Sequence, residues 1–187
     1  MRRHPIIVII LGAGLCVFVG YYVHLKLTSV PPPLPATTSG GNYSPEQFHH
    51  ALSNAEKKRV LDGEFRIVRA TEEMPLILKQ AFAAATGEQQ FALANPGQKY
   101  QVTDVIDEPG LPFRRLLFAG ESQKIWFIHY EHGGIGHGYA VLVFSKAQKD
   151  GLQFFWGGAG SESAKDLNDL RSKIAAGNFR DNLVYYW

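Results

Sequence analysis

The chain has 187 residues, of which 45% are hydrophobic, 12% aromatic and 19% charged, a composition that can fill one packed domain and excludes a disordered protein. Its 19 basic and 17 acidic residues give a formal charge of +2, but three of the basic residues lie in the first 43 positions, so the remainder is nearly neutral and unlike a nucleic-acid-binding surface. The single cysteine, Cys16, excludes an intrachain disulfide, a zinc site built on cysteines and a Cys-x-x-Cys redox pair.

The first predicted element is a membrane-spanning helix. A run without any charge, residues 6–23, follows Arg2 and Arg3. Counted over residues 6–25, a helix would rise about 30 Å, which is the thickness of the hydrocarbon core of a bilayer. We therefore expect residues 1–26 to form an uncleaved transmembrane anchor. The alternative is a cleaved secretory signal, but the apolar region of such a signal is usually only about 7 to 15 residues long.

Flanking charge predicts the orientation of this anchor. Two arginines and the amino group precede the segment, while only Lys26 follows closely, which favours a cytoplasmic N-terminus, a single pass through the cell membrane and an extracytoplasmic C-terminal domain. Gly12, Cys16 and Gly20 place small side chains on one face of the helix, a pattern that would permit weak self-association. Glycine is, however, also frequent in membrane helices that do not associate.

Residues 27–43 are rich in proline, serine and glycine, and this composition predicts an extended, solvated spacer. Residues 44–187 then form the predicted domain. A helix of about 15 residues is expected from Ser44, which begins a capping box. A short edge strand follows at residues 64–70, and a second amphipathic helix at residues 75–86. A last helix is expected to begin at Ser163.

Between these helices the sequence predicts an antiparallel sheet. Segments rich in aromatic and branched residues alternate with short turn signals, and links this short permit only antiparallel neighbours. The predicted strands are residues 100–106, 115–119, 124–132, 137–146 and 152–157. The glycine-rich residues 157–161 are expected to form a flexible connector to the last helix. The fold class is therefore α+β, an antiparallel β-meander packed by about three helices.

One segment has the density of functional side chains that a site requires. The candidate ligand-binding residues are His129, Glu131, His132, Gly133, Gly134, Gly136, His137 and Tyr139. If residues 133–136 form a four-residue hairpin loop, His132 faces His137 across the strands, close enough for both imidazoles to bind one ion. The strand period of two places His129 and Glu131 on the face opposite to His132, so the three histidines do not all converge.

Three interpretations of this hairpin remain open. It can be purely structural, with glycines at positive φ; it can be a metal site completed by His49 or His50; or it can bind an anion or a partner through exposed glycine amides. Arg114 and Arg115 are interpreted as an exposed basic pair that discourages edge aggregation.

The sequence favours a binding module over an enzyme. No nucleophile motif or pair of catalytic carboxylates accompanies the histidines, and no pattern requires an organic cofactor. We therefore expect a membrane-anchored domain that binds a protein, a peptide or an envelope component. A metal-assisted hydrolase built on the hairpin histidines and a protein that blocks an incoming toxin or enzyme are the alternatives.

Overall fold

In the computed structural model, residues 51–106, 108–146 and 151–181 are described. The predicted anchor at residues 6–25, the linker at residues 27–43 and the start of the first predicted helix lie outside these ranges. Within them, no helix is long and apolar enough to cross a membrane.

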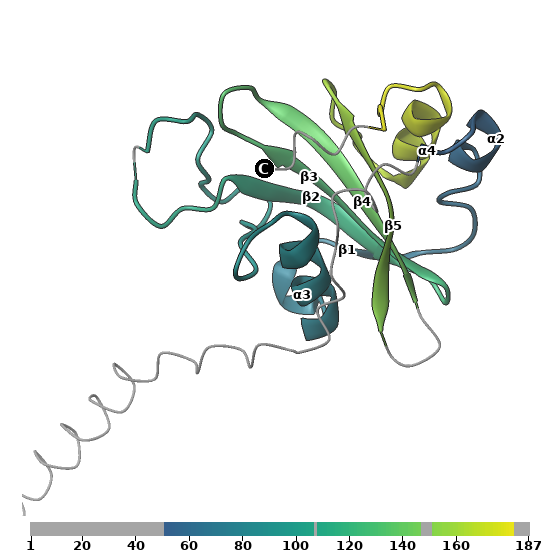
Figure 1. Ribbon diagram of the computed structural model, residues 1–187, viewed down its shortest axis with the longest axis horizontal. Helices are drawn as coiled ribbons and strands as arrows, with labels where there is room; N and C mark the ends of the chain where they lie inside the picture. Colours follow the sequence, from purple (N-terminus) through teal and green to yellow (C-terminus); the bar gives the residue numbers. More distant parts are fainter. Residues whose placement is uncertain (1–50, 107, 147–150, 182–187) are drawn as a thin grey trace, which may run out of the picture. The chain divides into compact units, whose positions relative to one another are not determined.

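The described residues form a five-stranded antiparallel sheet in the order of the sequence, as the predicted meander requires (Figure 1). Its strands are β1 (Arg66–Val68), β2 (Arg114–Glu121), β3 (Ile125–His132), β4 (Gly138–Lys146) and β5 (Leu152–Gly160). The shortest strand, β1, lies at one edge, where the sequence placed an edge strand.

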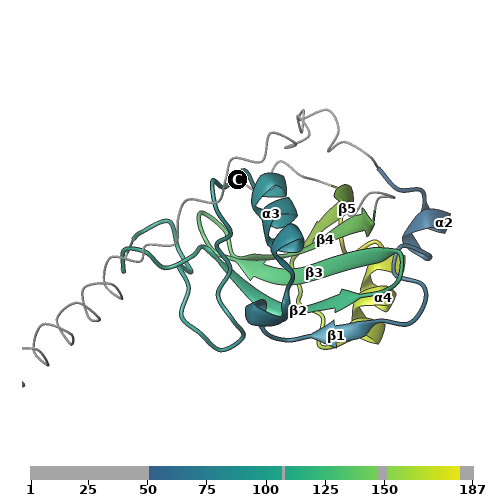
Figure 2. The same ribbon diagram turned by 90° about the horizontal axis from the view of Figure 1, so that it is seen from below.

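Helices cover both faces of this sheet. They are α2 (Asn54–Lys57), the 3-10 helix η2 (Thr71–Glu73), α3 (Leu76–Ala85) and α4 (Leu167–Ala175). Figure 2 shows α3 lying against one face, with α4 on the other. The α+β class predicted from the sequence is thus confirmed.

Two hydrophobic cores result, one for each face. The α3 core includes Val68, Met74, Leu78, Phe82, Leu116, Trp126, Ile128, Tyr130, Leu142 and Phe144. The α4 core includes Leu52, Leu61, Phe118, Phe127, Val141, Val143, Trp156, Leu170, Ile174 and Phe179. Consecutive residues of β3 enter opposite cores, as the strand period predicts. Fully burying one such apolar side chain stabilises the fold by about 1.5–3 kcal/mol.

The strand predicted at residues 100–106 is wrong. This segment belongs to a loop, and its one ladder contact is an isolated bridge between Thr103 and Gly134. Val102, Val105 and Ile106 gave it the composition of a strand, but all three side chains are exposed. Pairing partners, which composition does not reveal, decide whether such a segment becomes a strand.

The first predicted helix is confirmed over only one turn of its described part, α2. Residues 51–53 are not helical, and the observed capping box joins Ser53 and Glu56 at the start of the single turn α2. The last helix is confirmed, although its N-cap is Asp166 and not Ser163. Asp166 accepts a hydrogen bond from the amide of Asp169, so the helix begins three residues later than predicted.

The glycine run after Trp156 is part of β5 and not a flexible connector. A Cβ atom on Gly158 would lie 2.7 Å from the Trp156 ring and 2.9 Å from Cβ of Phe179. A Cβ atom on Gly160 would lie 2.8 Å from the carbonyl oxygen of Asn178. Glycine is required here because the segment after α4 packs directly on the strand.

Candidate functional site

The β3–β4 turn contains five residues, 133–137, and not the four predicted. His132 lies opposite Gly138, so the expected pairing of His132 with His137 is wrong. The reason is steric: a Cβ atom on Gly138 would lie 2.7 Å from Nε2 of His132. The imidazole therefore favours glycine at the facing position, which shifts the register by one residue and leaves His137 in the turn.

His129 is fully buried in the α4 core, where both of its ring nitrogens are bonded. Nδ1 lies 2.8 Å from the carbonyl oxygen of Ala140, which can only accept, and Nε2 lies 3.0 Å from the amide of Ala164, which can only donate. The neutral tautomer with its proton on Nδ1 satisfies both contacts. Burial lowers the pKa of His129 to about 4, so this histidine is uncharged at neutral pH and has no nitrogen left for a ligand.

Glu131 forms the centre of a polar cluster on the same face of the sheet. Its carboxylate accepts hydrogen bonds from Nε of Arg115 at 2.7 Å, from the hydroxyl of Tyr100 at 2.9 Å and from Nε2 of His137 at 3.1 Å. The guanidinium of Arg115 also lies 4.5 Å from the centre of the Tyr100 ring. The structure thus joins two predicted site residues, Glu131 and His137, to two residues from outside the hairpin.

Electrostatics keep this cluster in one ionisation state. Burial alone would raise the pKa of Glu131, but the hydrogen bonds from Arg115, His137 and Tyr100 outweigh it and the pKa is lowered. Burial and the bond to Glu131 raise the pKa of Tyr100 to about 12, so its hydroxyl remains a donor. Tyr139 lies opposite Glu131 in the ladder and packs edge-on against His137, with ring centres 4.9 Å apart.

The cluster holds His137 in place but gives it no nucleophile. A neutral His137 must donate from Nε2 to the carboxylate, which leaves Nδ1 as an acceptor on a partly exposed side chain. Among the described residues no hydroxyl is bonded to that nitrogen. The pair therefore lacks the third group that nucleophilic catalysis requires.

The glycine amides of the turn are partly occupied. The amide of Gly133 donates to the carbonyl oxygen of Phe113 at 2.9 Å, and that of Gly134 donates to Val102 at 3.2 Å. A Cβ atom on Gly133 would collide with the backbone of the loop at residues 101–113, and Gly134 has a φ of +113°. The N–H groups of Gly133 and Gly134 are therefore already engaged by carbonyl oxygens, whereas a Cβ atom on Gly136 would meet nothing within 4 Å.

A second polar cluster lies on the opposite face of the sheet, beside the α3 core. Arg114 is buried and forms an ion pair with Glu88, next to the buried Tyr130 and the half-buried His132. These side chains line a cavity of about 430 Å³. Its remaining lining residues are Thr86, Gly87, Asp104, Phe113, Gly133, Gly134 and Ile135.

Sequence reasoning missed both clusters because it treated two adjacent arginines as a solvated pair. Arg114 and Arg115 are consecutive residues of β2, so their side chains point to opposite faces of the sheet. Arg115 reaches Glu131 and Arg114 reaches Glu88, and Arg114 is only 6% exposed. The alternation of side chains along a strand could have revealed this, because it places two consecutive arginines on opposite faces and therefore in different environments.

The hairpin does not form the predicted metal site within the described part of the chain. Residues 51–106, 108–146 and 151–181 contain no group of three His, Cys, Asp or Glu side chains that could hold a metal ion. His132 and His137 are not paired, and both nitrogens of His129 are occupied. His49 and His50, the expected further ligands, lie outside the described residues.

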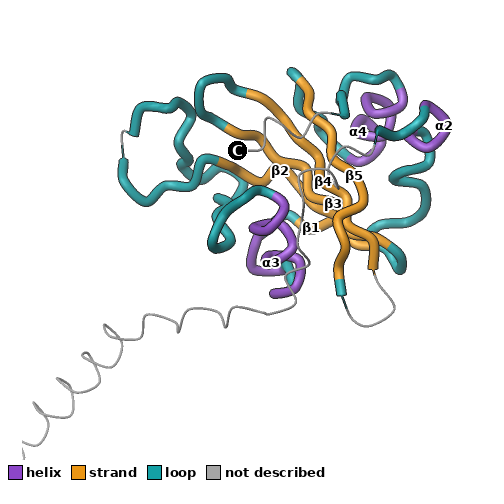
Figure 3. The backbone as a smooth tube through the Cα atoms, in the orientation of Figure 1, coloured by secondary structure: helices purple, strands orange, loops and turns teal. Residues whose placement is uncertain are grey.

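Exposed apolar side chains gather next to the hairpin. Ile135 at the tip of the β3–β4 turn is 98% exposed, and Val105, Ile106 and Val102 are 63%, 62% and 50% exposed. The Gly134–Val102 hydrogen bond links the two loops that carry them. Figure 3 shows both loops extending from the same end of the sheet. We call these four residues the apolar loop end.

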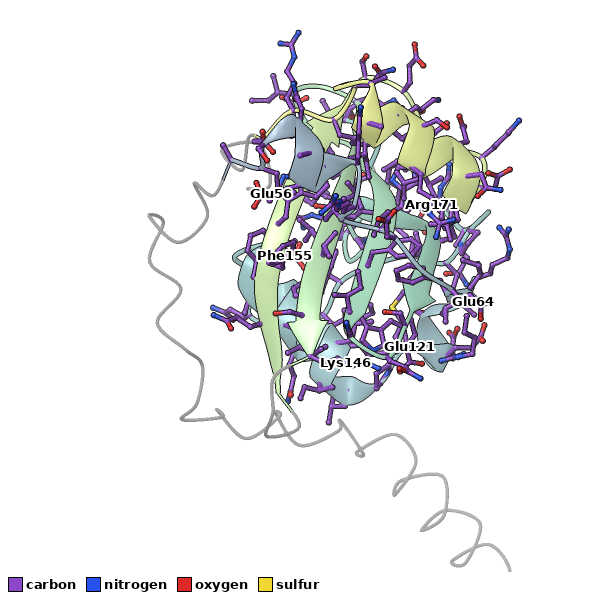
Figure 4. The ribbon with its side chains drawn as sticks, turned by 90° about the vertical axis from the view of Figure 1, so that its right-hand side faces the viewer. Glu56, Glu64, Glu121, Lys146, Phe155 and Arg171 are labelled. Atoms are coloured by element: carbon purple, nitrogen blue, oxygen red, sulfur yellow. The ribbon has the colours of Figure 1, made fainter. Side chains whose placement is uncertain are left out.

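A wider groove of about 1070 Å³ lies away from the predicted site. Its lining comes from α2, the β2–β3 turn and β5 and includes Phe155 (Figure 4). Glu121, on the groove wall, is bonded to both Arg66 and Lys146 at 2.9 Å. The described lining carries four acidic side chains, Glu56, Asp62, Glu64 and Glu121, and four basic ones, Arg59, Arg66, Lys124 and Lys146, so its formal charges balance.

Comparison with known proteins assigns no family to the chain. No protein-family model, no curated protein and no solved structure matches it.

Proposed function

We propose that this protein is a single-pass membrane protein whose extracytoplasmic domain binds a protein partner through the apolar loop end. The observation that carries the proposal is the exposure of Val102, Val105, Ile106 and Ile135 on two linked loops. Apolar groups gathered on the surface of a monomer are a common feature of interaction sites, because covering them removes apolar surface from water.

The rigid support beneath these loops favours the same proposal. Through Arg115, His137 and Tyr100, the Glu131 cluster joins β2, β3, the β3–β4 turn and the residue directly before the loop at residues 101–113. Binding then orders little of the backbone, which reduces the entropic cost of association. In this proposal the polar cluster positions the loops, and the apolar side chains contact the partner.

The anchor comes from the sequence pattern alone. The uncharged segment at residues 6–25 has the length of a bilayer span, and the prolines that follow would hold the domain away from the lipid. Blocking an incoming toxin or enzyme would be one use of such a tethered surface. A metal-assisted hydrolase has less support, because the described residues lack a metal ligand set.

The experiment compares three forms of the full-length protein in cells that produce it. After treatment with a lysine-reactive crosslinker, proteins attached to the wild type, a loop variant and a helix variant are quantified by mass spectrometry. The loop variant carries Val105→Ser, Ile106→Ser and Ile135→Ser. The helix variant carries Leu76→Ser and Ile77→Ser, which remove exposed apolar groups from α3 instead.

We expect a defined protein that is attached to the wild type and the helix variant and at least about fivefold depleted with the loop variant, a loss of about 1 kcal/mol of binding free energy. The same set of attached proteins in all three samples would contradict the proposal.

A further inference from the structure

An exposed carboxylate lies within the apolar loop end. Asp104 is exposed and directly precedes Val105 in its loop. Thr103 forms an isolated parallel bridge with Gly134 of the β3–β4 turn. Asp104 and Ile135 are the next residues of these two loops, so the bridge makes them neighbours. A partner that covers Val105 and Ile135 must therefore also cover this carboxylate.

Within its described part, the chain supplies no ion-pair partner for Asp104. The loop at residues 101–113 contains three acidic residues and no Lys or Arg. The basic side chains on either side of this loop are bonded to other carboxylates. These pairs are Lys99 with Glu108 at 3.2 Å, Arg114 with Glu88, and Arg115 with Glu131 at 2.7 Å. Solvent water is therefore the main stabilisation of the Asp104 charge when no partner is bound.

Covering the apolar loop end removes that water. A purely apolar partner would leave the carboxylate of Asp104 without hydrogen bonds, which is unfavourable for a charged group. An acidic protein or a surface of anionic lipid headgroups would add repulsion between like charges. A basic side chain with apolar neighbours avoids both penalties, because it bonds the carboxylate while its neighbours cover Val105, Ile106 and Ile135.

We propose that the partner of the apolar loop end is a protein segment in which Arg or Lys is flanked by apolar side chains, and that this basic group donates hydrogen bonds to the carboxylate of Asp104. The inference rests on the proposed function, because it specifies the partner of that same surface. Arginine suits the contact well, since its guanidinium is weakly hydrated and can bond both oxygens of a carboxylate.

The test uses the full-length protein in intact cells, with a photoreactive phenylalanine analogue in place of Ile135 as the probe. The yield of crosslinked adduct is measured for the wild-type sequence at position 104 and for Asp104→Leu and Asp104→Asn. Asp62→Leu is the matched control. Asp62 is also exposed, but it lines the groove beside the β2–β3 turn, at the other end of β3.

Asp104→Leu separates the alternatives by the sign of its effect. It enlarges the apolar surface, so a partner held by apolar contacts alone would give more adduct, whereas a partner that bonds the carboxylate gives less. We expect the yield to fall at least about threefold with Asp104→Leu and with Asp104→Asn, and to stay unchanged with Asp62→Leu. Mass spectrometry of the adduct after chymotrypsin digestion should identify a partner segment that contains Arg or Lys.

Several results would overturn the inference and leave the proposed function standing. These are an unchanged or higher yield with either variant of Asp104, an equal loss with Asp62→Leu, and an attached segment without Arg or Lys. Adducts with lipid alone, or no adduct in the wild-type background, would remove the proposed function and this inference together. Equal thermal midpoints of the purified variants establish that a lower yield does not result from unfolding.

Discussion

The buried His129 makes the domain sensitive to acid. In the folded state its pKa is about 4, against 6.5 for an exposed histidine. Because the folded-state pKa is the lower one, the unfolded chain takes up the proton first as pH falls, and stability is lost below about pH 6.5. A pKa difference of this size corresponds to about 2 kcal/mol at about pH 5 and to about 3 kcal/mol once pH is below both values.

The contacts of His129 explain why protonation is unfavourable. A proton on Nε2 would face the amide hydrogen of Ala164, which is itself a donor. The aromatic rings of Phe118 and Phe179, with centres 5.3 and 5.7 Å from the imidazole, exclude water from the charge. His129→Gln keeps one donor and one acceptor but does not titrate.

The assay is urea unfolding of the full-length protein in detergent, followed by tryptophan fluorescence at about pH 7.5 and about pH 5. The wild type should lose about 2 kcal/mol more unfolding free energy than His129→Gln over this interval. The variant itself should be less stable at the higher pH by about 1–3 kcal/mol, because its side chain fills the aromatic site less well. Equal losses for both proteins would refute the reasoning.

Three further predictions follow from the site and the sequence. Gly133→Ala should lower the free energy of unfolding by at least about 2 kcal/mol, because its Cβ would collide with the loop at residues 101–113; an unchanged urea midpoint would contradict this. Glu131→Gln should cost about 1–3 kcal/mol at neutral pH, and its deficit should shrink in acid, because the lowered pKa of Glu131 stabilises the fold only while the carboxyl is ionised. A phosphatase reporter fused after residue 187 should be active outside the cytoplasm, and an inactive reporter would argue against the predicted orientation.

The sequence predicted most of the sheet because its strands are rich in aromatic and branched residues and its links are short. Residues 124–132 and 75–86 lie within one or two residues of the observed β3 and α3. It failed where a distant segment determines the local conformation. Residues 157–160 are strand because Phe179 and its neighbours pack on them, and nothing local distinguishes this glycine run from a connector.

The candidate site was predicted in part. The hairpin was located correctly, but its register depends on the contact between the His132 ring and Gly138, which a turn-length argument does not contain. Glu131 and His137 meet because the longer turn folds His137 back onto the strand. Tyr100 is 31 residues away from Glu131 along the chain, and Glu88 is 26 residues away from Arg114. Patterns in a single sequence do not reveal contacts between such distant residues.

Contact between the apolar loop end and a partner can be detected by site-specific photo-crosslinking. A photoreactive phenylalanine analogue replaces Ile135 in the full-length protein, and Leu76 on α3, 53% exposed, receives the same analogue as the matched control. After irradiation of intact cells, we expect one discrete crosslinked protein at position 135 and none at position 76. No adduct at position 135, or the same adducts at both positions, would contradict it.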